Sequence, residues 1–500
     1  MRGPLLQRCR ARLPPPDRER GPAGPEHRES GCLIAARSGR RLAIETPAAS
    51  RRTRRRSFLA RHPVQGVCHN VSSSPPASPS PASPSPSHCD GTHPDLGELL
   101  TNCVHCGFCL EVCPTYQMTG DENNSPRGRL RLWREEHEGR LSVDPWTAHY
   151  TSECVGCLAC EPACPANVPY GEILEQVRHQ HVEQARAKPR LSLRLAAALT
   201  SKQWLFNLAM APARWLRSMG ILPHRFLFAG RPSLIESTAQ YATRLMKQHR
   251  PTGPKVALLT GCLMEAVFRE INFATIRVLI ENNVQVVIPP DQGCCGAFQE
   301  HLGLDGVEEM RAQNRTAFEP LDLDAIVCNS SGCGLALSKS LTDRVPVRDV
   351  LAFLGDLNPV RRVRSPGSTR VYVDLPCHLI HGQKQAGIPA NVLDATGYTW
   401  ELAPQARDCC GSGGVYNIQK PENSREILAK KSTFLNEAQG DPVVLATSNH
   451  VCMMQWNSAR SGGLVKRPYI VQHVIQLLDP GDDLTVRPAD HASRLPGNAQ

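Results

Sequence analysis

Two short runs of cysteine constrain this chain more than any other feature. Residues 103–114 read CVHCGFCLEVCP, and residues 154–165 read CVGCLACEPACP. Each run places four thiols at intervals of two, two and three residues and ends in proline, so the two runs repeat one pattern. In a chain of 500 residues, thiols packed this closely predict a shared ligand rather than disulfides, which are typical of short secreted proteins.

The spacing of the runs predicts two 4Fe–4S clusters. In two-cluster ferredoxins a C-x2-C-x2-C segment binds one cluster, and a fourth cysteine followed by proline binds the other. Zinc sites use two pairs of ligands and would leave cysteines over in each run. The expected ligand sets are Cys103, Cys106, Cys109 and Cys164 for the first cluster, and Cys154, Cys157, Cys160 and Cys113 for the second.

Helices are expected around these runs. The 40 residues between Cys113 and Cys154 are long for a hairpin-built ferredoxin and suit intervening helices. The segment GEILEQVRHQHVEQARAK, after the second run, has the period of an amphipathic helix. We therefore predict a helical two-cluster ferredoxin-type domain over residues 95–185 and a helical connector over 186–250. The apolar and basic part of the connector is expected to pack on a neighbouring domain or partner subunit in preference to a membrane surface.

From residue 254 the sequence changes to buried strands that alternate with helices. KVALLTGC and TRVYVDLPC each read as a strand that ends in a cysteine, Cys262 and Cys377 respectively. In both places 31 residues separate this cysteine from a Cys-Cys-Gly sequence. Such a long repeated interval indicates a tandem duplication. We predict two α/β units, over residues 254–345 and 369–478, and an α+β multidomain fold for the chain.

Each α/β unit is expected to gather four thiols at the carboxyl ends of its strands, where open α/β sheets place their sites. The sequence leaves three alternatives open for these thiols: an iron–sulfur cluster, which we favour for at least one unit, a zinc ion, or buried structural cysteines. The expected groups are Cys262, Cys294, Cys295 and Cys333 in the first unit, and Cys377, Cys409, Cys410 and Cys452 in the second.

Little else in the sequence indicates chemistry. The GSGG at 411–414 lacks the pattern and the downstream acid of a dinucleotide-binding fingerprint. No flavin motif, Ser/His/Asp order or paired carboxylates stand out, so catalytic residues are unassigned and the chain is expected to carry electrons rather than hold an organic substrate. The histidines near the cysteines are expected to be surface residues or neighbours of ligands rather than ligands: His105, His378, His381 and His450.

Residues 1–90 differ in composition from the rest. They hold 16 arginines, no lysine and six acidic residues, so this segment carries the whole net charge of +10. Its Ser/Pro-rich stretch at 72–88 cannot bury a core, and we expect a disordered leader that is either an organelle transit peptide or sequence upstream of a misassigned start. Nucleic-acid binding would depend on this tail alone and is not expected. Its cysteines receive no role: Cys9, Cys32, Cys68 and Cys89.

No run of about 20 apolar residues appears, so no membrane span is expected. Near Met1 no apolar core follows the arginines, so no secretory signal peptide is expected.

Residues from about 95 to 480 resemble the iron–sulfur subunit of bacterial glycolate oxidase. The resemblance is carried by NCVHCGFCLEVCPTYQMTGDENNSPRGRL, by CVGCLACEPACPANVPYGEILE and by the two Cys-Cys-Gly units. It implies the electron-transfer subunit of a flavin-dependent 2-hydroxy-acid dehydrogenase. Flavoprotein partners would oxidise glycolate to glyoxylate, and a quinone pool would be the final acceptor. It also implies a cytoplasmic protein, or one held peripherally at the inner face of the cell membrane.

The wider family supplies the alternatives. It includes iron–sulfur subunits of lactate utilisation, of anaerobic glycerol-3-phosphate dehydrogenase and of heterodisulfide reductase. In the last, the Cys-Cys-Gly unit ends in C-x2-C and holds a noncubane cluster. Here four residues separate Cys328 from Cys333, and the second unit ends in a single cysteine, Cys452. This departure argues against a heterodisulfide-reductase-like enzyme that acts on thiols or disulfides.

Overall fold

The computed structural model of the protein describes residues 95–141, 145–221, 234–341, 344–363, 368–481 and 483–486. All of them belong to one compact unit, Ser87–Gln500. The expected leader over residues 1–90, with its four cysteines and the two interpretations given for it, lies outside the described residues. The boundaries drawn between domains from the sequence remain predictions.

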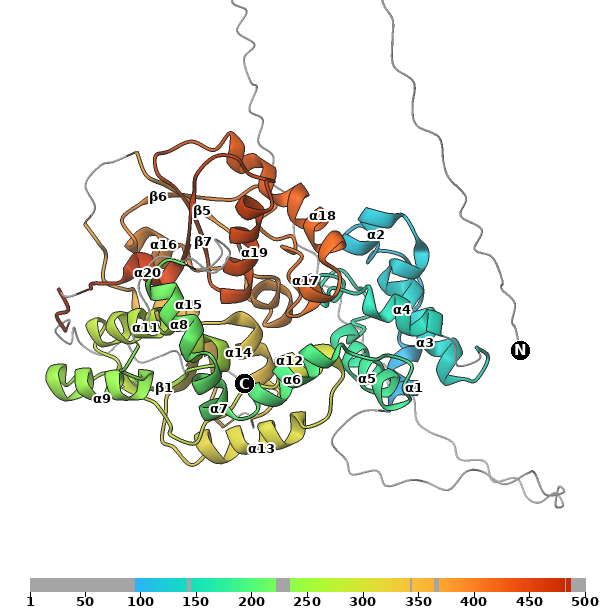
Figure 1. Cartoon of the computed structure of the whole chain (residues 1–500), viewed down its shortest axis with the longest axis horizontal. Coiled ribbons are helices and arrows are strands. Elements are labelled where there is room, and N and C mark those ends of the chain that lie inside the picture. The colour runs from blue at the N-terminus through green and yellow to red at the C-terminus, as the bar shows by residue number, and fades with distance from the viewer. Residues whose placement is uncertain are drawn as a thin grey trace, which may run out of the picture. The chain divides into compact units, whose positions relative to one another are not determined.

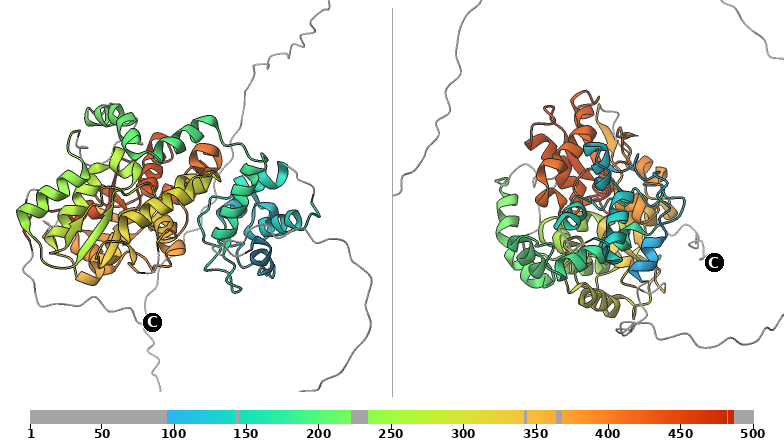
Figure 2. Two further views of the ribbon diagram at one scale, coloured as in Figure 1. Left: turned by 90° about the horizontal axis from the view of Figure 1, so that it is seen from below. Right: turned by 90° about the vertical axis from the view of Figure 1, so that its right-hand side faces the viewer.

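Both cysteine runs occupy loops between short helices. The first run joins α1 to α2, the second joins α4 to α5, and these helices cluster together around the two loops (Figures 1 and 2). Ser125 caps α3 by accepting a hydrogen bond from the Gly128 amide at 3.0 Å, and Pro126 follows at the first helical position. The helix bounds are α1 (Leu96–Thr101), α2 (Pro114–Thr119), η1 (Glu122–Asn124), α3 (Pro126–His137), α4 (Pro145–Ser152) and α5 (Tyr170–Glu183).

In the described residues, four helices follow before the first sheet. They are α6 (Leu191–Thr200), α7 (Gln203–Ala209), α8 (Ala211–Ser218) and α9 (Thr238–His249). The helix α8 is fixed to the first α/β unit by two buried arginines: Arg214 donates to the Ala266 carbonyl at 2.8 Å, and Arg217 pairs with Glu270. Among the described residues no helix combines the length and apolar character needed to cross a bilayer.

Two four-stranded parallel sheets follow, with the same strand order. The first sheet runs β2-β1-β3-β4 and the second β6-β5-β7-β8. The strands of the first are β1 (Lys255–Leu259), β2 (Gln285–Val287), β3 (Ala325–Cys328) and β4 (Val347–Asp349). Those of the second are β5 (Arg370–Val373), β6 (Thr399–Leu402), β7 (Val443–Thr447) and β8 (Ile470–His473). The predicted fold class, a helical region followed by two α/β units, is confirmed.

Helices connect and flank these strands (Figure 1). In the first unit they are α10 (Cys262–Val267), α11 (Arg269–Glu281), α12 (Ala297–Leu302), α13 (Val307–Phe318), α14 (Ser331–Ser338) and α15 (Val350–Leu357). In the second they are the π-helical turn η3 (His378–Gly382), α16 (Ala390–Ala395), α17 (Tyr416–Gln419), α18 (Pro421–Ser432), η4 (Thr433–Asn436), α19 (His450–Ser461) and α20 (Val474–Leu478). The edge strands β4 and β8 were not expected, and β4 begins beyond residue 345, where the first unit was expected to end.

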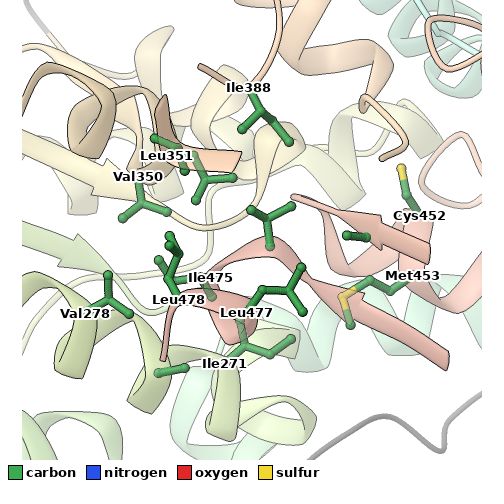
Figure 3. Packing of buried hydrophobic residues seen from close by; sticks show 14 of the residues in the cluster. Ile271, Val278, Val350, Leu351, Ile388, Cys452, Met453, Ile475, Leu477 and Leu478 are labelled. Atoms are coloured by element: carbon green, nitrogen blue, oxygen red, sulfur yellow. The ribbon is translucent and has the colours of Figure 1, made fainter. Parts of the chain in front are cut away.

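The two α/β units share one hydrophobic core. Ile271 and Val278 of α11 and Leu351 of α15 pack together with Ile475 and Leu478 of α20 (Figure 3), and all five side chains are buried. An ion pair between Arg277 and Asp479, at 2.5 Å, closes the edge of this contact. Because the apolar faces of both units are buried against each other, neither sheet is expected to fold as drawn without its neighbour.

Candidate metal centre

The two cysteine runs adopt the same backbone conformation. In the first run the residues on either side of the second cysteine, His105 and Gly107, have positive φ angles of 56° and 92°. In the second run the equivalent residues, Gly156 and Leu158, have φ angles of 73° and 63°. Left-handed residues turn the chain back on itself, so each run forms a wrapped loop rather than an extended segment. The repeat in the sequence is thus also a repeat of conformation.

The thiols of the first expected set border one cavity. This cavity has apolar walls formed in part by Leu130, Val168 and Tyr170. The cysteines that line it are Cys103, Cys106, Cys109, Cys160 and Cys164. The first run and the last cysteine of the second run therefore meet, as crossed ligation requires. Their assignment as ligands stays a prediction.

The thiols of the second expected set are also close together, but deeper in the protein. Burial raises the pKa of the Cys160 thiol well above its usual value, and the neighbouring thiols of Cys157, Cys154 and Cys113 raise it further. Cys113 is buried, with its sulfur 3.3 Å from the Thr115 hydroxyl. All four thiols of this set thus lie within electrostatic reach of one another.

A buried arginine lies beside the second set. Arg129, on α3, is 1% exposed and donates hydrogen bonds to the Tyr150 carbonyl at 2.7 Å and to Thr115 and Asn124 at 3.2 and 3.3 Å. These acceptors are neutral, and the nearby groups that favour its charge are the Tyr170 hydroxyl first, and then the thiols of Cys154 and Cys113. A buried cation is costly unless an anion compensates it. The donor set therefore fits an anionic metal–thiolate group at this place.

The four thiols of the first α/β unit meet at one edge of its sheet. Cys262 follows β1, Cys294 and Cys295 follow β2, and Cys333 lies in the first turn of α14 after β3. The sulfur atoms of Cys294 and Cys262 are 3.6 Å apart. Hydrogen bonding with Cys262, and then with Cys295, lowers the pKa of the Cys294 thiol well below its usual value. A thiolate is the form that binds metal ions, so this group can present one.

The second unit repeats this arrangement. Cys377 follows β5, Cys409 and Cys410 follow β6, and Cys452 lies in the first turn of α19 after β7. Hydrogen bonds from Cys409, and then from Cys452, lower the pKa of the Cys410 thiol well below its usual value. The ammonium group of Lys431 also favours the charged form of Cys410. The expected juxtaposition of the four thiols is thus present in both units.

The two units differ at one thiol. Cys328, at the end of β3, belongs to the same apolar cluster as Cys295 and Cys333. The equivalent place in the second unit is taken by Thr447, at the end of β7. The second unit instead receives a thiol from outside itself, because Cys157 of the second cysteine run lies against Cys409.

Among the described residues, no three His, Cys, Asp or Glu side chains are gathered as the ligands of a single metal ion would be. A 4Fe–4S cube makes a different demand, because each thiolate binds a separate iron at a separate corner. Wrapped loops around a cavity meet that demand, and the thiols of the two runs are the donors that such clusters use.

The four histidines noted in the sequence lie in different surroundings. His105 is partly exposed in the first cysteine loop, and His381 has its Nε2 3.4 Å from the Arg407 carbonyl. His378 donates from Nε2 to the Gly156 carbonyl at 2.9 Å. His450 is buried, with its ring 5.9 Å from that of Phe268. Sequence reasoning missed His301, whose ring stacks on His378 with centroids 5.9 Å apart.

Arg129 was also missed, because a basic residue in an amphipathic helix is normally exposed and nothing in the sequence marks it as buried. The expectation that none of the four histidines is a ligand stays a prediction.

Comparison with known families defines the class of the protein. Residues 99–168 match the family described as 4Fe-4S dicluster domain. Residues 256–338 and 371–457 each match the family described as Cysteine-rich domain. The chain is therefore an iron–sulfur protein that joins a dicluster domain to two cysteine-rich domains.

Individual relatives narrow this class. The chain is 32% identical over 399 residues to the probable glycolate oxidase iron-sulfur subunit of Bacillus subtilis (strain 168), a match that covers 72% of this chain and 89% of the relative. It is 31% identical over 382 residues to the glycolate oxidase iron-sulfur subunit of Escherichia coli (strain K12), covering 72% and 90%. Lactate utilization protein A of Oceanobacillus iheyensis is 25% identical over 243 residues, covering 45% of this chain and 96% of the relative. The chain belongs to the family of glycolate oxidase iron–sulfur subunits, which confirms the resemblance seen in its motifs.

Membership of this family supports an iron–sulfur subunit of an oxidoreductase, with an electron-transfer role.

Proposed function

We propose that this chain is the electron-transfer subunit of a flavin-dependent 2-hydroxy-acid dehydrogenase of the glycolate oxidase type. Flavoprotein partners oxidise glycolate to glyoxylate, and this chain passes the electrons toward the quinone pool. Two 4Fe–4S clusters, which take up and release single electrons, are held by Cys103, Cys106, Cys109 and Cys164 and by Cys154, Cys157, Cys160 and Cys113.

One observation carries the proposal. Two loops of matching backbone conformation bring their eight thiols together in two adjacent groups, and the second group lies beside a buried arginine with neutral hydrogen-bond acceptors. Thiols alone could be structural, but a buried cation next to them calls for negative charge at that place. Clusters ligated by thiolates supply that charge.

The surface around the first group suits a docked redox partner. Cys106 is exposed, and its neighbours in the loop, Val104 and Phe108, are 70% and 65% exposed. Apolar side chains at this level of exposure beside a ligand loop favour a protein partner that covers them. We assign this surface to contact with the flavoprotein subunits.

A second surface supports peripheral membrane contact at the inner face of the cell membrane. The helices α6, α7 and α8 and the residues that follow them to 221 expose a set of large apolar side chains, and no acidic residue occurs between Glu183 and Glu236. The exposed side chains include Arg190, Arg194 and Lys202. Tryptophan, leucine and basic residues on one set of short helices are typical of binding to anionic lipid. The exposed apolar side chains are Leu191, Leu195, Trp204, Leu208, Trp215, Met219 and Ile221.

Metal analysis tests the cofactor content. Iron, sulfide and zinc are measured on anaerobically purified full-length chain, with EPR spectra of the reduced and oxidised states. About eight irons per chain, as two 4Fe–4S clusters, are expected. Ten or more irons would place a further cluster in the Cys-Cys-Gly units, and zinc in addition to about eight irons would make those units zinc sites. Four or fewer irons after full reconstitution would refute the two-cluster assignment.

Activity of the assembled complex tests the role. Cys106→Ser should remove the first cluster and most of the quinone-linked glycolate oxidation, while flavin reduction by glycolate on the partner persists. Full quinone-linked activity in the Cys106→Ser complex would refute a relay through this chain.

A second candidate follows from the match to lactate utilization protein A. The chain would then serve a lactate-utilisation complex rather than a glycolate oxidase, or, more distantly, an anaerobic glycerol-3-phosphate dehydrogenase. Turnover of the purified complex with glycolate, lactate and glycerol 3-phosphate separates these possibilities. Thiol–disulfide turnover by the isolated chain would instead favour the heterodisulfide-reductase-like alternative.

Vesicle flotation tests the membrane surface. The full-length chain should bind vesicles that contain phosphatidylglycerol at least tenfold more tightly than vesicles of phosphatidylcholine alone. A Trp204→Ala/Trp215→Ala variant should lose this binding, whereas Trp146→Ala should not, although Trp146 is 63% exposed. Equal binding by all three proteins would exclude α6–α8 as the lipid-binding surface.

A further inference from the structure

A second cavity lies where the helices on either side of the second cysteine loop (residues 154–165) meet both α/β units. Its volume of about 340 Å³ is within the range of small-molecule sites. Its walls come from α4, from α5 and the segment that follows it to residue 190, from α12, and from the junction of α17 and α18. The helices α4 and α12 both pack against α5 (Figure 1). No cysteine is among the described residues that line this cavity, so it is separate from the proposed metal sites.

The lining side chains that carry a full charge at neutral pH are all basic. Residues 91–500 as a whole hold equal numbers of acidic and basic side chains, so a wall of one sign is a local feature. Clefts lined by one sign of charge attract ligands of the opposite sign. Among the described residues the charged lining side chains are five cations, without an aspartate or glutamate: Arg178, Arg186, Lys188, Arg190 and Lys420.

Two of these cations already have a carboxylate partner. Arg186 pairs with Glu136, and Lys420 pairs with Glu153. Even so, the Nε atom of Arg186 is buried and donates to no acceptor within the described part of the chain, at a side chain that is 12% exposed. A buried donor without an acceptor is uncommon in folded proteins. An anionic oxygen in the cavity that Arg186 lines would supply the acceptor.

The other three cations have no carboxylate partner. Arg178 lies beside the second cysteine loop and donates to the Cys154 carbonyl at 2.7 Å. Lys188 and Arg190 are exposed, border the cavity and form no ion pair with any described residue. Their surplus of two positive charges favours a ligand with two negative charges, which is close to the charge of a phosphate monoester at pH 7. Arginine also binds phosphate oxygens through two parallel hydrogen bonds.

The rest of the wall is partly apolar. Val182, Pro189 and Leu302 line the cavity, and Leu302 is buried. Small-molecule sites combine apolar walls with a few polar groups that fix the orientation of the ligand. Apolar walls add nothing to the binding of inorganic phosphate, but they favour a ligand in which the phosphate is attached to an organic group.

We propose that this cavity binds a phosphate monoester, with its phosphate group held by Arg186, Lys188 and Arg190 and its organic group against the apolar walls. The site is additional to the proposed electron transfer. Two sources share this chemistry, namely a soluble phosphate ester and the headgroup of phosphatidic acid. The second is included because α6, which begins directly after Arg190, belongs to the surface assigned above to lipid.

Isothermal titration calorimetry of the full-length, cluster-loaded chain with phenyl phosphate tests the inference. Lys188→Met/Arg190→Gln should weaken binding by about tenfold or more. The matched control Lys202→Met/Arg194→Gln removes two exposed cations that do not line the cavity, and should bind as tightly as wild type. Inorganic phosphate should bind more weakly than phenyl phosphate. No binding to wild type, or equal affinities of the two double variants, would overturn the inference.

Vesicles separate the two sources of the ligand. If vesicles of phosphatidylcholine that contain phosphatidic acid displace phenyl phosphate from the wild-type chain, and vesicles of phosphatidylcholine alone do not, the ligand is a lipid headgroup. If neither displaces it, the ligand is a soluble phosphate ester. Failure of the proposed function is distinguishable from failure of this inference, because it would appear as too little iron or as an intact quinone-linked activity in Cys106→Ser, and not as a change in phosphate binding.

Discussion

Replacing Arg129 by glutamine tests the electrostatic part of the proposed site. The Nη2 atom of Arg129 lies 3.2 Å from the Thr115 hydroxyl, which lies 3.3 Å from the Cys113 sulfur. The cation and this proposed ligand are therefore at most 6.5 Å apart. The side chain is buried, so water screens the interaction weakly. Removing the cation should make the second cluster harder to reduce.

The size of the effect follows from Coulomb's law. With an effective dielectric constant of about 20, two unit charges 6.5 Å apart interact by about 2.5 kcal/mol. An added electron spreads over the cluster, beyond the ligating sulfur, and at about 10 Å the same expression gives about 1.7 kcal/mol. For a one-electron couple these energies correspond to roughly 70–110 mV. We expect the midpoint potential to fall by that amount in Arg129→Gln.

The assay is an EPR-monitored redox titration of the full-length chain, with iron content measured on the same sample. Arg129→Lys keeps the positive charge and should retain most of the wild-type potential, which separates the effect of charge from that of altered packing. A potential in Arg129→Gln that equals or exceeds the wild-type value, at full iron content, would refute the view that this cation compensates the second cluster.

Three further predictions concern the second α/β unit. Lys431 and Asp374 form an ion pair at 2.6 Å, with side chains 2% and 1% exposed. Lys431→Met should lower the free energy of unfolding, measured with denaturant, by about 3–5 kcal/mol, and a Lys431→Met/Asp374→Asn double variant should recover much of this loss. Equal losses in the single and the double variant would contradict the prediction. Burial lowers the pKa of His473 from 6.5 to about 4, and its neutral ring accepts from the Ile475 amide at 3.1 Å. Because the unfolded state binds the proton first, stability should fall by about 1.4 kcal/mol per pH unit as the pH drops from 6.5 to 4, and His473→Asn should flatten that slope in thermal melts. Gly413→Ala should destabilise the chain by about 1–3 kcal/mol more than Gly463→Ala, because both glycines have positive φ but only Gly413 faces the Val155 carbonyl. Equal melting temperatures of the two variants would argue against close docking of the second cysteine loop on the second unit.

Much of the fold could be predicted because its signals are local. The strands β1, β3 and β7 consist mostly of Val, Leu, Ile and Ala, and β5 reads RVYV, which is close to the pattern of strands buried on both faces of a parallel sheet. The duplication was visible in the 31-residue interval before each Cys-Cys-Gly. By contrast, β4 and β8 have only three and four residues, are at sheet edges and mix polar with apolar residues, so their pairing depends on a preformed neighbour.

The grouping of thiols within each α/β unit was also predictable, because a parallel sheet brings the carboxyl ends of its strands to one edge. The contact of Cys157 with Cys409 was not, because it joins segments about 250 residues apart in the sequence through the docking of a loop on another unit. The burial of Arg129 could not be predicted for a similar reason, since helix periodicity shows which side chains share a face but not what covers that face.

These two unpredicted features act on the same group of thiols. Arg129 approaches the second set from α3, at the Cys113 side, and Cys409 approaches it from the second unit, at Cys157. The first set also has a cation beside it, Arg127, but this side chain is 30% exposed and pairs with Glu122 at 2.6 Å, and Cys106 itself is exposed. A buried cation with neutral hydrogen-bond acceptors stabilises a reduced cluster more than a partly exposed cation that is paired with a carboxylate, so Arg129 favours the second set as the site of higher potential. Electrons would then be held at the buried set, next to the second unit, rather than at the exposed loop.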